Sequence, residues 1–417
     1  MQATREDSGS VWQGSSRALT EGAAHYRLGL ENTLLQIGGR QADFEKVAYP
    51  EQSGGREFSR NDDRDRSDGR DQTAYLSGEL SPSENWRLAV QYSEYDRQLD
   101  YHSPGIAPYD NVPENFYVAD YRRNQWRLVS DLSYADVNIN LGVDRRWEEG
   151  VSEGAVIFPN IPLDALGFLP GLPSTPVETG LSAPTPLALD TDYHLRRTTR
   201  GRFVQVNWQA GNELVFSAGL RRDDTDDYRE IVRRYLMGIP LWEWGRVNLS
   251  YSEGFKSPSF FALGHGLVGN PELKPERVDS YQLDFYFQWG TFEFELGVFE
   301  TEYTNLIDFD AEAFTNVNRN SVQSHGGELA VLTRRADWNL RGSVSHVNID
   351  IEDSDRNLAN RPQNTAILEV SWQPGERLSW YNRLRWIDEQ FATSLHTGAS
   401  REYVLDRYTM WDTLLRW

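Results

Sequence analysis

The clearest pattern along the chain is an alternation of apolar and polar positions with a period of two residues. From Tyr281 to Trp289 every second residue is aromatic or apolar, and after Gly290 the alternation resumes from Phe292 to Val298. Polar residues fill most of the positions between. Such a period over about 8–10 residues predicts a β-strand with one apolar face, because a helix repeats every 3.6 residues. The two segments therefore predict antiparallel strands joined by a tight turn.

The same alternation marks other parts of the chain, at 126–134, 137–143, 204–208 and 214–220. Strands of this length exceed the 5–6 residues usual in globular sheets. Extended along the chain, the pattern predicts about 16–18 strands.

The connections between these segments alternate between short and long. Short turns are expected at 81–85, 135–136, 210–212, 289–290, 335–337 and 373–377, and long connections near 47–71, 101–115, 151–193, 255–277, 300–320 and 388–402. Outer-membrane barrels have short periplasmic turns and long extracellular loops. The predicted fold class is therefore all-β, a transmembrane antiparallel β-barrel that must close, because lipid cannot satisfy a free strand edge.

Composition is compatible with that prediction. Mean hydropathy is −0.64, and no apolar run approaches the ~18 residues of a transmembrane helix. Aromatic residues form 12% of the chain, with 14 Trp and 20 Tyr, and such rings suit membrane interfaces. The net charge of −21 argues against nucleic acid as a partner. Cysteine is absent, which removes disulfides and thiolate metal sites and fits a periplasm-facing protein.

One stretch carries a more specific signal. Gly254-Phe255-Lys256-Ser257-Pro258-Ser259, followed by Gly269-Asn270-Pro271-Glu272-Leu273-Lys274-Pro275-Glu276-Arg277, resembles a loop signature of TonB-dependent outer-membrane receptors. Further fragments resemble the same family in the expected order, at 220–224, 302–308, 318–329, 358–364 and 408–414. The resemblance covers residues 195–417 well and residues 20–150 only as pattern. The spacing is nearest to the cobalamin-receptor branch, although siderophore receptors share most of these residues.

The resemblance implies a domain plan. Residues 23–417 would form part of a receptor barrel, which in this family has 22 strands, and the polar residues 1–22 would lead into it. The family's N-terminal plug domain, its energy-coupling box and its last two strands are not visible in this sequence. Residues 1–8 contain no apolar segment of a signal peptide. The chain is thus expected to be a partial barrel without its plug.

The resemblance also implies a function and partners. A receptor of this family would sit in the outer membrane of a Gram-negative bacterium, in contact with its lipid. It would take up a large scarce nutrient, a siderophore–metal chelate or a cobalamin, energised by TonB-ExbB-ExbD through the plug. Two alternatives remain: a plugless, porin-like passive channel, and a soluble or surface-attached β-rich binding protein.

Two further segments resemble motifs that bind nucleotides or calcium. Gly264–Gly269 matches G-x-G-x-x-G but runs into Asn270-Pro271, so we expect a glycine-rich extracellular loop and no nucleotide site. Asn61–Asp71 is acidic, but the sixth position of an EF-hand counted from Asp63 is Asp68 where glycine is needed. A solvated acidic loop is expected there, with calcium as the alternative.

The long connection at 151–193 is apolar and rich in proline and glycine. We expect it either to fold over the mouth and contact ligand or a surface partner, or to pack on its neighbours.

Signals for catalysis or cofactors are absent from the sequence. The histidines, at positions 25, 102, 194, 265, 325, 346 and 396, show no metal-ligand spacing, and neither G-x-S-x-G nor H-E-x-x-H occurs. We therefore predict no enzyme activity, no catalytic, cofactor or metal residues, and no bound cofactor. The ligand-contacting residues are not identified by sequence.

Overall fold

The computed structural model describes residues 2–9, 16–48, 65–105, 113–158, 187–211, 213–310, 313–319, 321–352, 360–394 and 401–417. Almost all of them lie in antiparallel strands, and nineteen strands form one sheet. The described part has no helix long and apolar enough to cross a membrane.

The strands of this sheet are β1 (Gln2–Gly9), β2 (Ser16–Leu30), β3 (Thr33–Ala48), β4 (Asp65–Ser83), β5 (Trp86–Ser103), β6 (Glu114–Tyr134), β7 (Val137–Phe158), β8 (Leu187–Asp190), β9 (Tyr193–Ala210), β10 (Leu214–Asp224), β11 (Arg229–Leu241), β12 (Gly245–Lys256), β13 (Glu276–Trp289), β14 (Phe292–Thr304), β17 (Val322–Arg335), β18 (Trp338–Ile351), β19 (Asn364–Gly375), β20 (Leu378–Ile387) and β23 (Tyr408–Arg416). Two hairpins stand apart, β15 (Leu306–Asp310) with β16 (Thr315–Arg319), and β21 (Gln390–Ser394) with β22 (Arg401–Leu405). The helical elements are η3 (Trp242–Trp244) and α1 (Phe260–Gly264).

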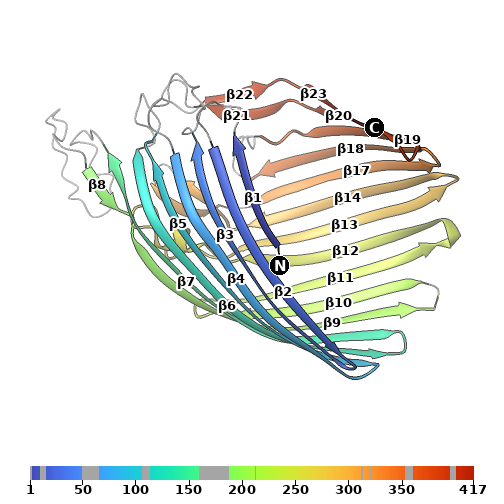
Figure 1. Cartoon of the computed structure of the whole chain (residues 1–417), viewed down its shortest axis with the longest axis horizontal. Helices are drawn as coiled ribbons and strands as arrows, with labels where there is room; N and C mark the ends of the chain where they lie inside the picture. The colour runs from blue at the N-terminus through green and yellow to red at the C-terminus, as the bar shows by residue number, and fades with distance from the viewer. Residues whose placement is uncertain are drawn as a thin grey trace.

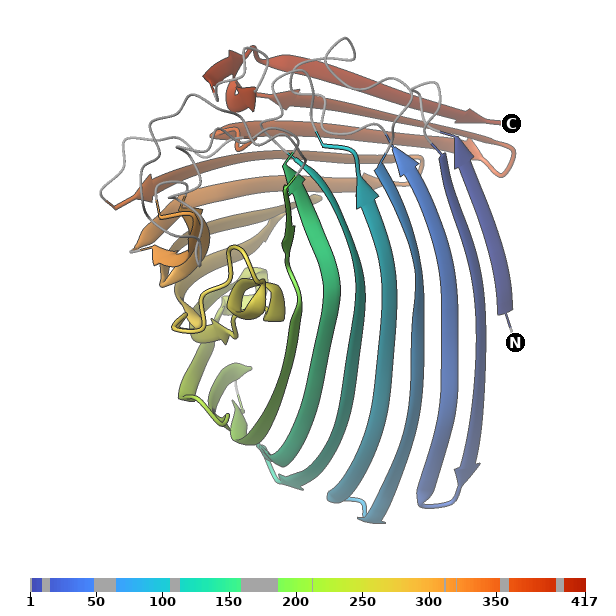
Figure 2. The same cartoon turned by 90° about the vertical axis from the view of Figure 1, so that its left-hand side faces the viewer.

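Apart from the short β8, which pairs only with β7, each strand of the sheet pairs with the sheet strands next to it along the chain, so the sheet is one long meander. It curls round so that the blue strands and the red strands stand at its two edges (Figure 1), and in Figure 2 both chain ends lie on the right-hand side. Among the described pairings, β1 has only β2 as a partner and β23 has only β20. The all-β barrel architecture is confirmed. So is the expected strand number, once the four-residue β8 beside β7 is set aside.

The short turns lie where the alternation breaks, as predicted. Ala135 and Asp136 connect β6 to β7, and Gly290 and Thr291 connect β13 to β14. Gly290 has a φ of +61° and Ala135 a φ of +47°, the left-handed backbone that lets a two-residue turn follow the twist of the hairpin. Glycine adopts this conformation freely, whereas alanine does so at some cost.

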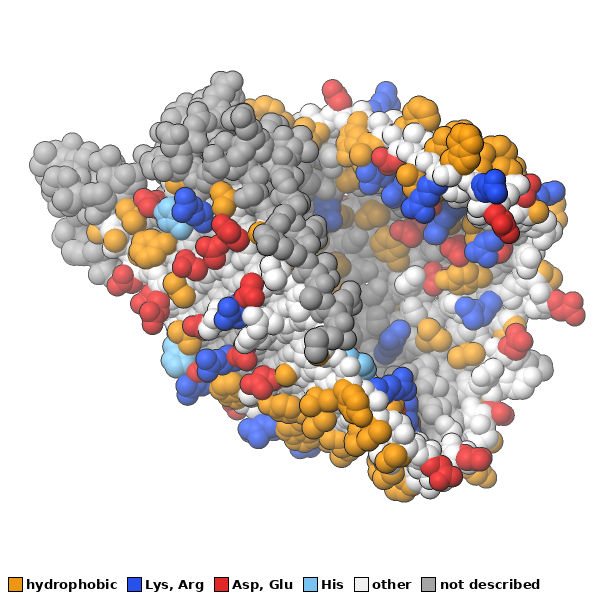
Figure 3. Space-filling view, viewed as in Figure 1, with side chains coloured by type: hydrophobic (Ala, Val, Ile, Leu, Met, Phe, Trp, Pro, Cys, Tyr) orange, Lys and Arg blue, Asp and Glu red, His pale blue; other side chains and the backbone are white. Residues whose placement is uncertain are grey.

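The two faces of the sheet differ in character. One face carries rows of exposed apolar side chains, including Trp126, Leu128 and Leu296. The other face lines the hollow and is rich in charged and polar groups, so that few apolar residues of the described part are fully buried. Figure 3 shows this hollow, with side chains of both charges gathered in it. The apolar-out, polar-in alternation is that of an outer-membrane barrel.

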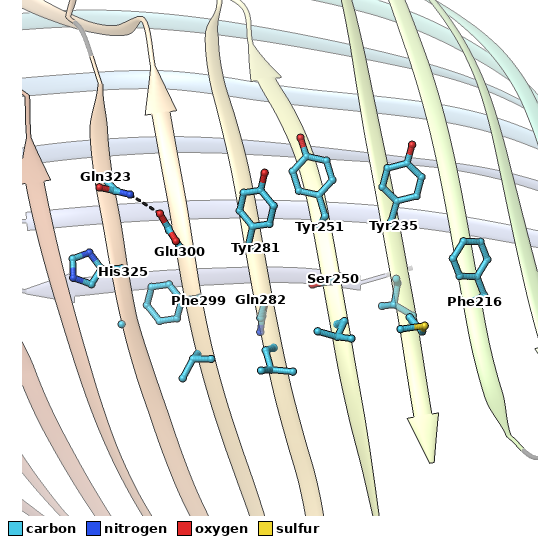
Figure 4. A pocket seen from close by; sticks show the side chains of 16 residues that line it. Phe216, Tyr235, Ser250, Tyr251, Tyr281, Gln282, Phe299, Glu300, Gln323 and His325 are labelled. Carbon is cyan, nitrogen blue, oxygen red and sulfur yellow. Dashed lines mark hydrogen bonds between the residues drawn. The ribbon is translucent and has the colours of Figure 1, made fainter. Parts of the chain in front are cut away.

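Aromatic side chains mark both edges of the apolar band. Tyr235, Tyr251 and Tyr281 lie side by side on β11, β12 and β13 and point the same way (Figure 4). At the turn end, Trp289 is 75% exposed and Trp338 stacks on Trp372 at 5.5 Å. Eight residues of β13 separate the two edges, which at ~3.3 Å per residue and ~40° tilt gives a band about 20 Å tall. Such aromatic belts fit the two interfaces of a membrane.

Several strands continue well beyond this band, and here the sequence prediction was wrong. Residues 65–71 belong to β4, residues 151–158 to β7 and residues 300–304 to β14, although all were expected in loops. Outside lipid a strand needs no apolar face, so its alternation disappears. The expected division into residues 1–22 and 23–417 stays a prediction; β1 and the start of β2 lie in the first part.

Candidate functional site

The segment that carries the receptor-like signature, residues 257–275, connects β12 to β13 and is called the mouth loop below. It lies inside the ring of strands, at the end opposite the short turns (Figure 2). Its first turn is fixed locally, because the Ser259 side chain accepts a hydrogen bond from the Ala262 N–H at 3.0 Å and caps α1. Pro258 is fully buried, and Phe260 and Ala262 are almost fully buried. The mouth loop is therefore a packed element of the barrel.

Arg197 on β9 is the main anchor of the mouth loop. Its Nη1 donates to the Pro258 carbonyl at 2.9 Å, and its guanidinium lies 4.9 Å from the centre of the Phe260 ring. Its Nε also donates to Glu148 Oε2 at 3.2 Å, and Tyr121 donates its hydroxyl to Glu148 Oε1 at 2.7 Å. One arginine thus joins the loop to three adjacent wall strands through bonds that are largely shielded from solvent.

The wall has a gap at this place that the mouth loop fills. β10 ends at Asp224, which pairs with Arg200, so residues 193–199 of β9 have a strand partner, β7, on one side only. α1 packs against this part of β9. Gly264 and Gly266 permit the approach, because a Cβ on Gly266 would lie 2.8 Å from the Asp190 carbonyl oxygen. The loop thereby covers a strand edge that would otherwise be unpaired.

The far end of the mouth loop is bonded to the β15–β16 hairpin. Asn316 donates to the Val268 carbonyl through both its backbone N–H, at 2.9 Å, and its Nδ2, at 2.7 Å. Asn270 returns a bond from its Nδ2 to the Asn316 carbonyl at 2.9 Å. Asn318 bonds both the N–H and the carbonyl of Lys274. Two loops far apart in sequence therefore form one layer across part of the mouth.

This layer presents aromatic side chains to solvent. Phe261 is 49% exposed, and its ring lies 4.6 Å from that of His265, the residue that caps the C-terminal end of α1. On the hairpin, Phe309 and Phe314 meet edge to face at 5.6 Å. Aromatic rings exposed at a mouth can stack on a planar or apolar ligand.

The surroundings of His265 favour its neutral form. Burial lowers the pKa of the His265 side chain, because the charged imidazolium is poorly solvated there. Its Nδ1 accepts hydrogen bonds from the N–H groups of Leu267 and Val268, both at 3.3 Å. A protonated ring could not accept them.

Deeper in the hollow, charged groups are paired across strands. Arg221 holds Asp144 with two hydrogen bonds of 2.7 and 3.0 Å and also bonds Asp223 at 2.6 Å. Both carboxylates are buried. The paired charges give the inner wall fixed positions at which a polar surface can form hydrogen bonds. The bidentate pairs also hold these side chains in one geometry.

The structure decides several of the sequence hypotheses. Gly264–Gly269 begins at the last residue of α1 and is followed by a strand, β13, so it does not lie at the start of a helix and forms no phosphate cradle. The acidic segment divides: Asp65, Asp68 and Asp71 lie on β4, where neighbouring side chains point to opposite faces. The expected acidic loop is therefore wrong for residues 65–71, which form a strand, and residues 61–64 lie outside the described part. The described residues contain no group of three or more carboxylates or histidines placed for a metal.

The apolar connection at 151–193 is described only at its ends, and residues 159–186 lie outside the described part.

The roles of Arg197, Glu148 and Tyr121 were not predicted from the sequence. In the sequence they differ in no way from the many other charged or polar residues on the polar face of an alternating strand.

Comparison with known proteins agrees with this geometry. The strands, the aromatic belts and the loop layer define a barrel domain of the outer-membrane type. A family model described as TonB dependent receptor-like, beta-barrel, matches residues 8–417. The chain therefore belongs to the TonB-dependent receptors, of which it contains the barrel domain.

Two curated relatives show the range of the family. The vitamin B12 transporter BtuB of Vibrio cholerae serotype O1 is 24% identical over 229 residues, which cover 54% of this chain and 36% of the transporter. The iron-regulated outer membrane virulence protein of the same species is 22% identical over 388 residues, covering 82% of this chain and 58% of that protein. The chain thus spans about a third to three fifths of the length of these relatives.

Solved structures agree in fold. The pyoverdine outer membrane receptor FpvA from Pseudomonas aeruginosa, bound to pyoverdine, superposes with a TM-score of 0.72 at 15% identity over 99% of this chain and 66% of that chain. The ferric yersiniabactin uptake receptor FyuA from Yersinia pestis gives 0.72 at 12% identity, covering 96% and 63%. At such identities the likeness shows the fold alone.

Proposed function

We propose that this chain is the barrel of an outer-membrane receptor that takes up a large scarce nutrient, either a siderophore–metal chelate or a cobalamin. The observation that carries the proposal is the loop layer at the mouth. Residues 257–275 are fixed to the wall by Arg197 and to the β15–β16 hairpin by Asn316, while Phe261 remains half exposed. A rigid layer with aromatic groups facing outward suits capture of a bulky ligand better than free diffusion of small solutes.

The proposal includes the placement and partners of the protein. The apolar band between the tyrosine and tryptophan rows would contact outer-membrane lipid of a Gram-negative bacterium. Uptake would draw on TonB-ExbB-ExbD through a plug domain seated in the hollow. The polar, charge-paired inner wall supports this, because it offers hydrogen-bond partners to a folded domain. No catalytic role is proposed, and the named relatives are transporters and receptors.

The substrate class is tested by uptake. The complete gene is deleted from its own host and restored on a plasmid, and cells are given a panel of ferric siderophores labelled with radioactive iron and, separately, labelled cyanocobalamin. We expect one class to accumulate only in the complemented strain. Equal accumulation of every probe with and without the gene would contradict the proposal.

A matched pair of variants links the uptake to the mouth. Arg197→Ala removes the anchor of the mouth loop, whereas Arg200→Ala removes a charge from the opposite face of the same strand. We expect the first to weaken binding of the accumulated probe and the second to leave it unchanged. Equal effects of the two variants would show that the layer has no part in binding.

A further inference from the structure

The ladder between β11 and β12 stops before either strand ends. Partner pairs run from Leu241 with Gly245 up to Arg234 with Ser252. Beyond that point β11 continues through residues 229–233, which pair only with β10, and β12 continues through residues 253–256, which pair only with β13. The ladders on either side, β10–β11 and β12–β13, remain intact to the last residue. We call this interruption of the wall the seam.

The seam begins where the wall passes from the apolar band into water. It begins just past Tyr235 and Tyr251, partners in the row that marks the upper edge of the apolar band. Below that row an unpaired backbone N–H would face lipid and cost several kcal/mol. Above it, water can bond the free backbone groups. An opening is therefore tolerated at this height of the wall and at none lower.

Side chains take the place of the missing ladder. Glu253 Oε2 accepts the backbone N–H of Arg233 at 2.8 Å, and Glu253 Oε1 accepts from the Arg233 guanidinium at 3.0 Å. Arg277 bonds Glu230 at 2.9 Å, and the hydroxyl of Tyr228 bonds that of Ser257. A cleft of about 330 Å³ lies among these groups. These bonds can break one at a time without disturbing the ladders that border them.

The seam also separates the mouth loop from the wall beneath it. The loop leaves β12 immediately above the seam and returns into β13, so the upper ends of these strands and the loop form one unit, which we call the flap. Across the seam, the flap is held by the side chains just described. At its tip it is held by Arg197 and by the β15–β16 hairpin. Its one continuous backbone connection to the wall is through β12, β13 and the intact ladder to β14.

We propose that the seam is a built-in joint at which the flap moves relative to β11, with Glu253 as the main closing contact. Movement at the seam shifts the mouth loop away from β9 and opens the mouth on that side, whichever nutrient enters it. Glu253 on β12 bonds Arg233 on β11, and Glu230 on β11 bonds Arg277 on β13. The seam is therefore closed by ion pairs that can break and re-form. The joint is independent of the proposed substrate.

Hydrogen exchange of the complete receptor in lipid nanodiscs tests the joint without a ligand. We expect amides of 229–233 and 253–256 to exchange at least about tenfold faster than those of 235–241 and 245–251. Glu253→Ala should speed the exchange of the first set again by about tenfold and leave the second set unchanged. If the two sets are equally protected, or if Glu253→Ala has no effect on the first, the joint does not exist.

A matched control and a second variant keep the test decisive. Glu300→Ala removes a carboxylate at the same height of the outer wall, bonded to Gln323 beside an intact ladder, and should leave all exchange rates unchanged. If Glu253→Ala fails to fold, Glu230→Ala replaces it with the same expectation. A rise as large in the control as in either seam variant would overturn the proposal.

A reversible cross-link provides an independent measurement, since the chain has no cysteine of its own. The double variant Arg233→Cys with Glu253→Cys bridges the seam when oxidised, whereas Leu236→Cys with Ser250→Cys bridges a pair already in the ladder. Oxidation of the seam pair should slow exchange in residues 257–264 severalfold, with recovery on reduction, and oxidation of the ladder pair should not. Unchanged exchange after complete seam cross-linking would refute movement at the seam.

Discussion

Arg197 shows how much of the mouth rests on single side chains. Its guanidinium joins a backbone carbonyl and an aromatic face of the mouth loop to a carboxylate of β7. Both Arg197 and Glu148 are nearly shielded from solvent. Loss of Glu148 leaves the charge of Arg197 unpaired there, and loss of Arg197 leaves Glu148 with Arg146 as its one ion-pair partner. The signature segment could be located from sequence, but its anchor could not, because β9 contributes Arg197 from some sixty residues away.

We expect Arg197→Ala to destabilise the packed mouth loop by about 3 kcal/mol, since it removes one partner of a buried ion pair. Arg197→Lys should recover only part of this, because a lysine cannot serve the carbonyl and Glu148 in the same forked geometry. Limited proteolysis within residues 257–275 measures the effect. Arg200→Ala is the control, and equal cleavage of both alanine variants would contradict the anchoring role.

His265 predicts a pH dependence of the mouth loop. Burial places the pKa of His265 below its ordinary value of 6.5, so the neutral ring stabilises the folded loop fully above pH 6.5. That stabilisation is lost as the pH falls through the lowered pKa, because the unfolded loop binds the proton more tightly. Cleavage of the loop should therefore accelerate on acidification, measured with a protease whose own activity is calibrated at each pH.

The matched control for that titration is a histidine elsewhere on the wall. His265→Gln should flatten the pH profile, whereas His325→Gln, on the outer face of β17, should retain it. A profile that persists in His265→Gln would assign the effect to another group.

At the scale of the strands, the alternation in sequence was enough to locate most strands and turns. Within the apolar band each outer position must be apolar and each inner position is polar, so the pattern is strict. The upper ends of β4 and β7 were not predicted as strands because both of their faces contact water. Polar residues are tolerated on either face there, so the alternation is lost. The seam could not be foreseen either, since the sequences of β11 and β12 show no break where their ladder stops.

The alternation predicts opposite responses at adjacent positions of β14. Leu296 lies on the outer face midway between the two aromatic rows, and Glu295 faces the hollow. Leu296→Arg should cost about 2–4 kcal/mol of folding free energy, because it places a charge near the centre of the bilayer. Glu295→Arg should cost far less, and urea unfolding in lipid vesicles compares them. Similar costs at both positions would mean that the faces are assigned wrongly.

The close packing of the mouth loop on the wall predicts that an added methyl group at the contact destabilises the protein. Gly266→Ala would place a Cβ 2.8 Å from the Asp190 carbonyl oxygen, a backbone atom that cannot turn aside. We expect the loop to shift and the cost to be about 1–3 kcal/mol, seen as a lower melting temperature of the purified receptor. Gly375→Ala, where a Cβ would meet nothing within 4 Å, should melt like the parent. A normal melting temperature for Gly266→Ala would show that the loop lies less tightly against β8 than described.

At the scale of the molecule, the curled sheet, its aromatic belts and its mouth layer together make a receptor barrel. Fold class and family could be predicted from alternation, connection lengths and the signature, because lipid imposes a strict rule on every strand. The nature of the ligand could not, since it depends on a few side chains gathered from distant loops. The same holds for the joint at the seam, which is visible only when neighbouring strands are compared.

The most direct test of the whole account is the energy dependence of uptake. Cells that carry the complete gene are given the labelled probe that they accumulate, with and without a protonophore, and the initial rate is compared with that of the deletion strain. An energised receptor predicts that the protonophore reduces the rate to the level of the deletion strain. A rate that the protonophore leaves unchanged would mean passive diffusion through an open barrel and would contradict the account.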